Sequence, residues 1–538
     1  MINEKNLPAD AEKLKAIIGQ QSIQIRTHQQ DLQKCCVQIK QHETQLQTKD
    51  EQIKARDNEI AILQEALRLA RIQRFASHSE KLPSNQSELF NEVEVCASTK
   101  EEKEVEEDSI EVSSHTRQRP KREPLPAHLP REEVIIDLPE SEKVCSKDGT
   151  PLKEISPEVS EQLDIIPAQI KVIRTIRKKY VCPCCQDEAN IKTAPLPEKI
   201  LPKSNATAGL LAYIATSKYV DALPMYRLEQ IFERSGVVIP RNTMCRWMIG
   251  LLEKLTPLYN MMEEDLLASD YICCDETRTQ VLNEPGKTPQ SRSYMWVRTR
   301  HGPGSSPIVL FDYDPTRSKE VAKQLLKGFK GYLQADGYGS YDEVCLSLDI
   351  IRLGCMAHVR RKFFDEFKAS NKKNQTAKQV LILIKGLYKI EREIKEKTIE
   401  DRFQIRLEKS KPILDKIKAW LDAHQNHYGL MGKAVTYTTN QWDYVINYLK
   451  DGRLEIDNNF TENRIRPFAV GRKNWLFSDS VAGAKASAMI YSIIQTARAN
   501  GLEPFAYMKY LFTELPKCKT ADQIEKLLPH KIDYKVLN

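Results

Sequence analysis

The order of strand-like and helix-like segments between residues 271 and 367 restricts the fold more than any other feature of this chain. Apolar runs over 271–277, 293–300 and 307–313 predict three strands, and an amphipathic run over 318–329 predicts a helix. A fourth strand over 331–337, a fifth over 350–353 and a basic helix over 358–367 complete the series. The first and fourth strands end in the acids Asp275 and Asp336.

The order β-β-β-α-β-β-α is that of a ribonuclease H-like α/β core, in which the first and fourth strands lie side by side. Asp275 and Asp336 are therefore expected to converge. A third acid, Glu462, comes from the segment 457–477, where helical spacing places it on one face with Ile465 and Arg466. For Glu462 alone, the alternative is a solvated helix face held by salt bridges.

The helix that carries Glu462 should begin near Asn458 or Asn459, because asparagine is a favourable N-cap residue. Pro467 should stop or kink this helix soon afterwards, since proline lacks a backbone N–H.

Three converging carboxylates suit two Mg²⁺ ions, with Mn²⁺ as an alternative, because hard cations bind oxygen and keep positions for water and phosphate. Two such ions assist in-line phosphoryl transfer. Nearby acids compete for this role, namely Glu276, Asp312, Asp314 and Asp457. We discount Asp312 and Asp314, which lie at the edge of a proline turn, and Glu276, which should face away from Asp275 on a strand.

The first 80 residues carry an apolar residue at every seventh position. The repeat consists of Ile18, Ile25, Leu32, Ile39, Leu46, Ile53, Ile60 and Leu67. This period predicts a left-handed coiled coil. Its second seam is mostly polar, so we expect a marginal zipper that is completed in a homodimer or a higher oligomer. The alternative is a single amphipathic helix docked on its own protein.

Residues 81–130 are acidic and then basic and proline-rich, which predicts a disordered linker. Residues 131–198 suggest a zinc-ribbon-like domain with an alternating, strand-like segment over 169–177. Cys182 and Cys185 form one half of a zinc clamp, and Cys145 with Asp148 forms the other half. Because Asp148 stands where a thiolate would bind zinc more tightly, a bound Zn²⁺ and a ribbon that has lost its metal both remain open.

Residues 199–262 predict a helix-turn-helix. One helix covers 225–235, Gly236 supplies the turn, and a second helix begins at 240–243. Its first turns carry the candidate DNA-contacting residues Arg241, Asn242, Thr243 and Arg246. Helix pairs also occur in ordinary cores, so this interpretation depends on the neighbouring ribbon and basic segments.

Composition limits the partners and the cellular compartment that we expect for the protein. The chain of 538 residues has a formal net charge of +7, which favours a polyanionic partner. Thirteen cysteines, an odd number, together with an N-terminus that lacks an apolar signal region, favour a reducing cytoplasm. No apolar run reaches the roughly 20 residues needed to span a bilayer, so we expect no membrane association.

Several long blocks of the chain are distinctive, among them GCMAHVRRKFF and DGRLEIDNNFTENRIRPFAVGRKNWLFSDS. They resemble transposases of the insertion sequence sixty-six family, which are bacterial Asp-Asp-Glu enzymes. The similarity runs from the basic segment near Ala70 almost to the C-terminus. The ribbon departs from the family, because Asp148 replaces its usual second cysteine.

The resemblance implies that the catalytic acids are Asp275, Asp336 and Glu462. It also places the family's Cys-x-x-His signature at Cys355 and His358, beside the active site; the alternative for these two residues is core packing and a helix start. The catalytic core would span 263–510, with a helical insertion over 368–450 and a C-terminal tail over 511–538. A plain pair of charged helices is the simplest form of that insertion.

These features together predict a multidomain α+β DNA transposase. It would bind terminal inverted repeats, cut the element ends and join the 3′-hydroxyls to target DNA, in the bacterial cytoplasm at the nucleoid. Cations expected to contact DNA are Arg360, Arg361, Lys362, Arg464, Arg466, Arg472 and Lys473. The resemblance implies that companion proteins of the same element often take part. A repressor-like DNA-binding remnant and a metal-dependent nuclease without strand transfer are the rivals.

Overall fold

The computed structural model describes residues 11–75, 169–180, 192–370, 374–425 and 427–533. Contacts divide the chain into two units, one formed by 1–101, 197–233 and 238–538 and the other by 102–196 and 234–237. Among the described residues, no helix is long and apolar enough to cross a membrane.

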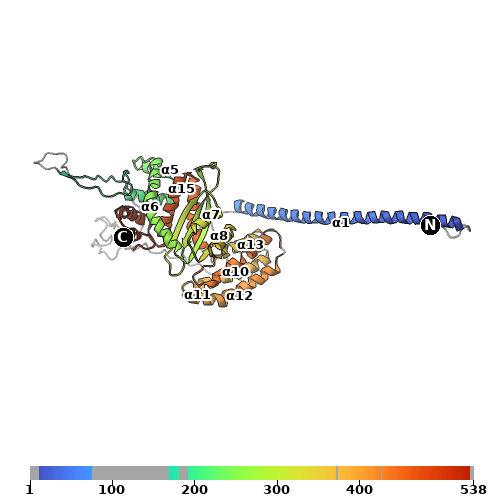
Figure 1. Ribbon diagram of the computed structural model, residues 1–538. Helices are drawn as coiled ribbons and strands as arrows, with labels where there is room; N and C mark the ends of the chain where they lie inside the picture. Colours follow the sequence, from blue (N-terminus) through green and yellow to red (C-terminus); the bar gives the residue numbers. More distant parts are fainter. Residues whose placement is uncertain (1–10, 76–168, 181–191, 371–373, 426, 534–538) are drawn as a thin grey trace, which may run out of the picture. The chain divides into compact units, whose positions relative to one another are not determined.

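A five-stranded mixed sheet forms the centre of the larger unit (Figure 1). Its strands are β3 (Tyr271–Thr279), β5 (Ser293–Arg300), β6 (Ile308–Asp314), β7 (Tyr332–Gln334) and β8 (Ile351–Leu353). They lie in the order β6-β5-β3-β7-β8. The first three strands pair antiparallel, and β7 and β8 continue the sheet parallel to β3. All five strands lie where the sequence predicts them.

The predicted adjacency of the first and fourth strands is confirmed. Tyr271 of β3 pairs with Tyr332 of β7, and Cys273 pairs with Gln334. Since the two strands are parallel, their carboxyl ends lie at the same edge of the sheet. Asp275 is within β3, and Asp336 follows two residues after the last residue of β7.

Helices cover the sheet and join its strands. α7 (Lys319–Leu325) is shorter than the helix predicted over 318–329, α8 (Ser340–Leu348) is not predicted from the sequence, and α9 (Met356–Ala369) starts just before the predicted basic helix. α6 (Arg241–Leu267) and α15 (Val481–Ala499) contact each other and the edge strand β6 (Figure 1).

The edge strand β6 has its outward N–H groups occupied by side chains of α15. The backbone N–H of Val309 donates to the hydroxyl of Thr496 at 2.9 Å, and that of Phe311 donates to the hydroxyl of Ser492 at 2.7 Å. An unpaired sheet edge would invite pairing with another chain, and these two bonds prevent it along the middle of β6.

The segment predicted as a helical insertion contains more than a pair of charged helices. It comprises α10 (Gln375–Ile394), α11 (Ile399–Ile405), α12 (Lys411–Ala423) and α13 (Gly429–Val445), with a π-helical turn at Arg406–Ser410 and a 3-10 turn at Ile446–Lys450. Leu387, Ile417 and Met431 from these helices share one buried cluster with Phe363 of α9 and Leu353 of β8. The insertion is therefore packed onto the sheet-bearing part of the same unit.

The helix with Glu462 begins as predicted but does not stop at Pro467. α14 covers Asn459–Trp475 and keeps Pro467 inside it. Proline removes one backbone donor from the helix. The buried side chains of Ile465 and Phe468 pack on either side of that position, and their burial offsets the missing bond.

Two helices match the predicted helix-turn-helix. α5 (Met225–Arg234) precedes Gly236, whose φ of +79° suits glycine, and α6 then begins at Arg241. Arg241, Asn242 and Arg246 are exposed and Thr243 is half-buried. α4 (Ala208–Tyr219) and α16 (Pro504–Glu514) contact each other in the same unit, and α17 (Ala521–Glu525) follows. β4 (Val281–Asn283) pairs with β9 (Ser478–Ser480) beside the main sheet.

The N-terminal heptad repeat lies on one continuous helix, α1 (Ala11–Phe75). Its seam residues from Ile18 to Ile60 are between 51 and 65% exposed. In the second unit, β1 (Lys179–Tyr180) pairs with β2 (Lys192–Thr193). The strand predicted over 169–177 is not assigned: those residues are exposed, and among the described residues the pairing begins at Lys179.

Candidate active site

Asp275 sits where β3 leaves the buried centre of the sheet. One carboxylate oxygen accepts the backbone N–H of Glu276 at 2.7 Å. The pKa of Asp275 is raised well above its ordinary value, chiefly by burial and then by the negative charges of Glu276, Glu462 and Asp336. The charges of both other predicted catalytic acids, Asp336 and Glu462, therefore affect the pKa of Asp275, although the three acids come from separate segments of the chain.

Asp336 lies in the loop after β7 and faces Arg317. Its carboxylate accepts the backbone N–H of Tyr338 at 3.0 Å and lies 3.7 Å from the guanidinium of Arg317. Arg317 also forms a close ion pair with Glu276, whose side chain is 1% exposed, and Tyr341 donates to the same carboxylate at 2.8 Å. Arg317 thus joins an acid of β3 to the acid after β7.

Sequence reasoning missed Arg317 and underrated Glu276. Strand alternation does turn the Glu276 side chain away from that of Asp275, toward Arg317 and Tyr341. Burial and the charge of Asp336 raise the pKa of Glu276, while Arg317 lowers it. Arg317 lies just after the proline turn and just before a helix. Nothing in the sequence around it indicates that its side chain would pair with the carboxylates.

Glu462, in the first turn of α14, meets the start of α9. One carboxylate oxygen is 3.7 Å from Nδ1 of His358, and the other is 3.5 Å from the guanidinium of Arg361. Burial lowers the pKa of His358, which opposes the raising effect of Glu462. The possible metal-binding atoms of Cys355, His358 and Glu462 all lie within 4.8 Å of one another. In the described part of the chain, this is the group of His, Cys, Asp or Glu residues that is close enough to hold a metal ion together.

The junction before α14 is fixed by four hydrogen bonds. The backbone N–H of Asn458 donates to Sγ of Cys355 at 3.3 Å, and the Asn458 side chain donates to the carbonyl of Cys274 at 3.1 Å. Asp457 accepts the hydroxyl of Tyr388 at 2.7 Å and the backbone N–H of Asn459 at 3.1 Å. This junction ties α14 to β3, to α9 and to the helical insertion, and so sets the position of Glu462.

The site has the donors that a hard divalent cation requires. An oxygen of Glu462, Nδ1 of His358 and the side-chain carbonyl of Asn458 are buried without a hydrogen-bond partner. Burial, and then the negative charges of Glu276, Glu462 and Asp336, raise the pKa of Asp275, and a bound cation would offset both effects. A soft metal on Cys355 fits less well, because burial raises the pKa of that thiol well above its ordinary value.

The remaining competitors have structural partners. Asp312 accepts the hydroxyl of Tyr259 at 2.6 Å and pairs with the buried Arg298. Asp314 caps its own turn by accepting the backbone N–H of Thr316 at 2.7 Å. The sequence did not decide whether Asp457 is a catalytic acid, and in the structure its carboxylate accepts hydrogen bonds from Tyr388 and Asn459.

The cations predicted to contact DNA lie in several environments. Arg360 is buried and its guanidinium lies over Phe364, whereas Lys362 is exposed. Arg464 lies over Phe460, and Arg472 donates to the hydroxyl of Thr277 at 3.2 Å. Arg466 is half-buried and Lys473 is exposed. Arg472 therefore approaches β3 two residues beyond Asp275, on the same face of the strand.

The predicted zinc ligands Cys145, Asp148, Cys182 and Cys185 lie outside the described residues, as does the predicted linker over 81–130.

Comparison with protein families gives four matches along the chain. Residues 203–486 match the family model described as "Transposase IS66 family". Residues 142–186 match "zinc-finger binding domain of transposase IS66", residues 492–530 match "IS66 C-terminal element", and residues 62–134 match "Transposase C of IS166 homeodomain".

Two similar proteins come from Sinorhizobium fredii. The chain is 34% identical to its uncharacterised protein y4jD over 420 residues, which is 75% of this chain and 81% of y4jD. It is 31% identical to its uncharacterised protein y4qI over 497 residues, which is 87% of this chain and 88% of y4qI. A solved structure, the Drosophila P element transposase strand transfer complex, overlaps with a TM-score of 0.33 at 10% identity, covering 56% of this chain and 94% of that chain.

Proposed function

Because the chain belongs to the IS66 family of transposases, we propose that it cuts and joins DNA as an Asp-Asp-Glu enzyme through Asp275, Asp336 and Glu462. Its substrates are the terminal inverted repeats of its own element and a target DNA. The observation that carries this proposal is the parallel pairing of β3 with β7, which brings the segments of Asp275 and Asp336 to one edge of the sheet. Burial, and then the charges of Glu276, Glu462 and Asp336, raise the pKa of Asp275, which is consistent with acids gathered at that edge.

The sheet supports a ribonuclease H-like core. Three antiparallel strands are followed by two parallel ones, and the first and fourth are neighbours. This arrangement supports the convergence of Asp275 and Asp336 at one edge of the sheet, where α14 would bring Glu462.

In this mechanism, Asp275, Asp336 and Glu462 would hold two Mg²⁺ ions, or Mn²⁺ in their place. When bound, these ions stabilise the attacking and leaving oxygens of the phosphoryl transfer. His358 and Arg361 hold the Glu462 carboxylate from two sides. Arg317 pairs with Glu276 and would balance part of the charge of Asp336. Arg472 and Lys362 would contact backbone phosphates of the DNA.

DNA recognition is assigned to the modules that precede the core. The exposed Arg241, Asn242 and Arg246 at the start of α6, with Thr243 beside them, would contact the repeats, together with the zinc-finger and homeodomain segments named by the family matches. The exposed heptad seam of α1 would pair two copies of the chain, because apolar residues at this period are stable only when covered. Companion proteins of the same element are a further expected partner.

Strand transfer is the decisive measurement. Purified protein with Mg²⁺ and DNA carrying the repeats that flank its gene should yield joined molecules, and Glu462→Gln should yield none. Asp314→Asn is the matched control, since that carboxylate only caps its own turn. Nicks without joining would favour a nuclease, and binding without cleavage, even with companion proteins added, would favour a repressor-like remnant.

A further inference from the structure

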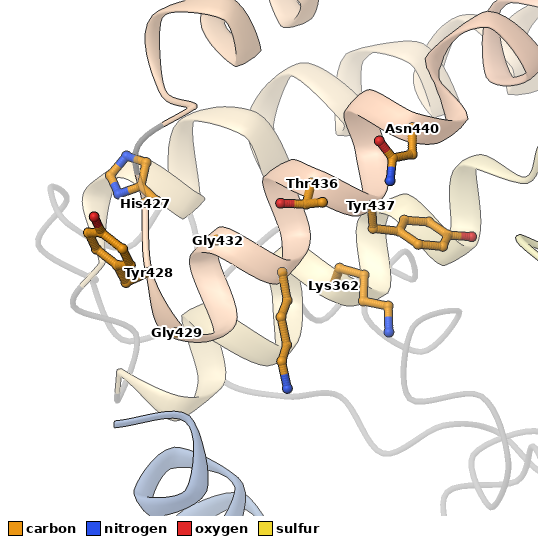
Figure 2. Close-up of a pocket in the computed structure, with 9 residues that line it drawn as sticks. Lys362, His427, Tyr428, Gly429, Gly432, Thr436, Tyr437 and Asn440 are labelled. Atoms are coloured by element: carbon orange, nitrogen blue, oxygen red, sulfur yellow. The ribbon is translucent and has the colours of Figure 1, made fainter. Parts of the chain in front are cut away.

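A cationic pocket lies between α9 and α13. Its volume is about 490 Å³, and among the residues that line it are Lys362, Lys433, His427, Tyr428 and Tyr437. No acidic side chain is among its described lining residues. Figure 2 shows Tyr437 on α13, and His427 and Tyr428 on the segment that leads into that helix.

The pocket contacts the loop of the candidate active site that carries Asp336. Gly337, which follows Asp336, lies so close to Tyr437 that a Cβ atom at position 337 would be 2.7 Å from the Tyr437 ring. On the other wall, the amine of Lys362 lies 5.6 Å from the centre of the same ring. Lys362 directly follows Arg361, the residue that reaches Glu462. The Tyr437 end of the pocket therefore adjoins the loop that carries Asp336.

A ladder of parallel rings ends at the pocket. The Trp420 and His424 rings are stacked with centroids 4.2 Å apart and an interplanar angle of 9°. The His424 and His427 rings continue the stack with centroids 5.5 Å apart and an angle of 5°. Trp420 is anchored edge-on against Phe363 of the buried core. His427 is the last ring of this ladder among the described residues and it lines the pocket.

The backbone keeps His427 in that place. Gly432, one turn into α13, lies against the backbone carbonyl of His427, and a Cβ atom at position 432 would collide with it. Gly429, which opens α13, has a φ of +69°, a conformation that favours glycine. Two glycines thus allow the segment before α13 to fold back closely onto the helix.

Resting on the proposed function, we propose that this pocket binds an unpaired nucleotide of the DNA strand engaged at the acidic site. The base would stack on the ring of His427, and Lys362 and Lys433 would contact the adjoining phosphates. A flat ring platform combined with cations is the arrangement that binds single-stranded nucleic acid with little sequence preference. A fully paired duplex could not place a base there without unpairing it.

The test measures binding of two fluorescein-labelled probes to the full-length chain by fluorescence anisotropy. One probe is an oligothymidylate, and the other is an abasic strand of equal length. The variants are His427→Ala, the pair Lys362→Gln with Lys433→Gln, and the control pair Lys409→Gln with Lys416→Gln, which alters two exposed lysines of the helical insertion that do not line the pocket.

Loss of the ring and loss of the lysines should give different results. His427→Ala should weaken binding of the oligothymidylate about tenfold and leave binding of the abasic strand unchanged. The pocket lysine pair should weaken both probes and lower the slope of log affinity against log salt by about 1.4. Equal effects of His427→Ala on both probes, or equal behaviour of the pocket and control lysine pairs, would overturn the proposal.

Crosslinking separates the pocket from other DNA-binding surfaces of the chain. A strand carrying 5-iodouracil should crosslink to His427 or Tyr428 on irradiation, and crosslinks found only elsewhere would overturn the proposal. Strand transfer by Asp275→Asn tests the proposed function independently. If that variant joins DNA while the pocket results hold, the catalytic assignment fails and the pocket stands; if it joins none while His427→Ala does not discriminate, the pocket fails alone.

Discussion

Nδ1 of His358 lies 3.7 Å from a carboxylate oxygen of Glu462, and both atoms are buried without a hydrogen-bond partner. The contact joins the first turn of α9 to the first turn of α14. Because the two helices belong to different segments of the chain, this contact helps to hold the carboxylate of Glu462 in the position that metal binding would require.

His358→Ala should lower the strand-transfer rate and raise the Mg²⁺ concentration needed for half-maximal rate, each by about tenfold, because a residue that orients a metal ligand is worth roughly that much. The measurement is a Mg²⁺ titration of strand transfer. His358→Gln retains a hydrogen-bonding side chain and should recover part of the loss. An unchanged Mg²⁺ requirement with a lower thermal midpoint would mean that His358 acts only in packing.

Arg317→Ala should lower the free energy of unfolding by about 2–4 kcal/mol, because it leaves the buried carboxylate of Glu276 without its cation. Denaturant unfolding measures this loss. The double variant Arg317→Ala with Glu276→Gln should be more stable than Arg317→Ala alone, since it removes the stranded charge. Losses that simply add would show that the ion pair is not the source of the effect.

Asp457→Asn should change how stability depends on pH. Burial raises the pKa of Asp457 from 3.8 to about 7. Between pH 3.8 and about pH 7, the unfolded chain has released a proton that the folded chain keeps. This group therefore makes the free energy of unfolding fall as pH rises toward about 7, and above that pH its contribution no longer changes. Between about pH 5 and about pH 8, the stability of the variant relative to the wild type should therefore rise by about 3 kcal/mol.

Thermal unfolding of both proteins across that range tests the Asp457 prediction. A difference between their midpoints that does not change with pH would mean that Asp457 is ionised in the folded chain. Asp314→Asn is a suitable control, because its carboxylate lies in a turn and no buried partner depends on it.

Ile39→Glu combined with Leu46→Glu should dissociate the chain into monomers, since both residues belong to the exposed heptad seam of α1. Sedimentation velocity measures the change. Gln41→Glu with Thr48→Glu adds the same charge two positions further along the helix, away from the seam, and should leave the assembly intact. A wild-type chain that sediments as a monomer would contradict the predicted zipper.

Local sequence patterns located much of the fold and the proposed acids. Apolar runs placed β3, β5 and β6 almost to the residue, and the N-cap preference of asparagine placed the start of α14 near Asn458 or Asn459. Two local expectations failed. In the described structure, no strand is assigned over the alternating residues 169–177. Pro467 does not end α14, because buried side chains hold the helix on both sides of it.

The sequence by itself determined the type and order of the elements, because periods of two, 3.6 and seven residues are properties of neighbouring residues. It also indicated, through strand order, that Asp275 and Asp336 should meet. Only the tertiary structure decided that Arg317 bridges Glu276 and Asp336, and that His427 ends a ladder of stacked rings at the pocket. Such relationships join residues far apart in the chain, and they exist only once packing has fixed the distances between their elements.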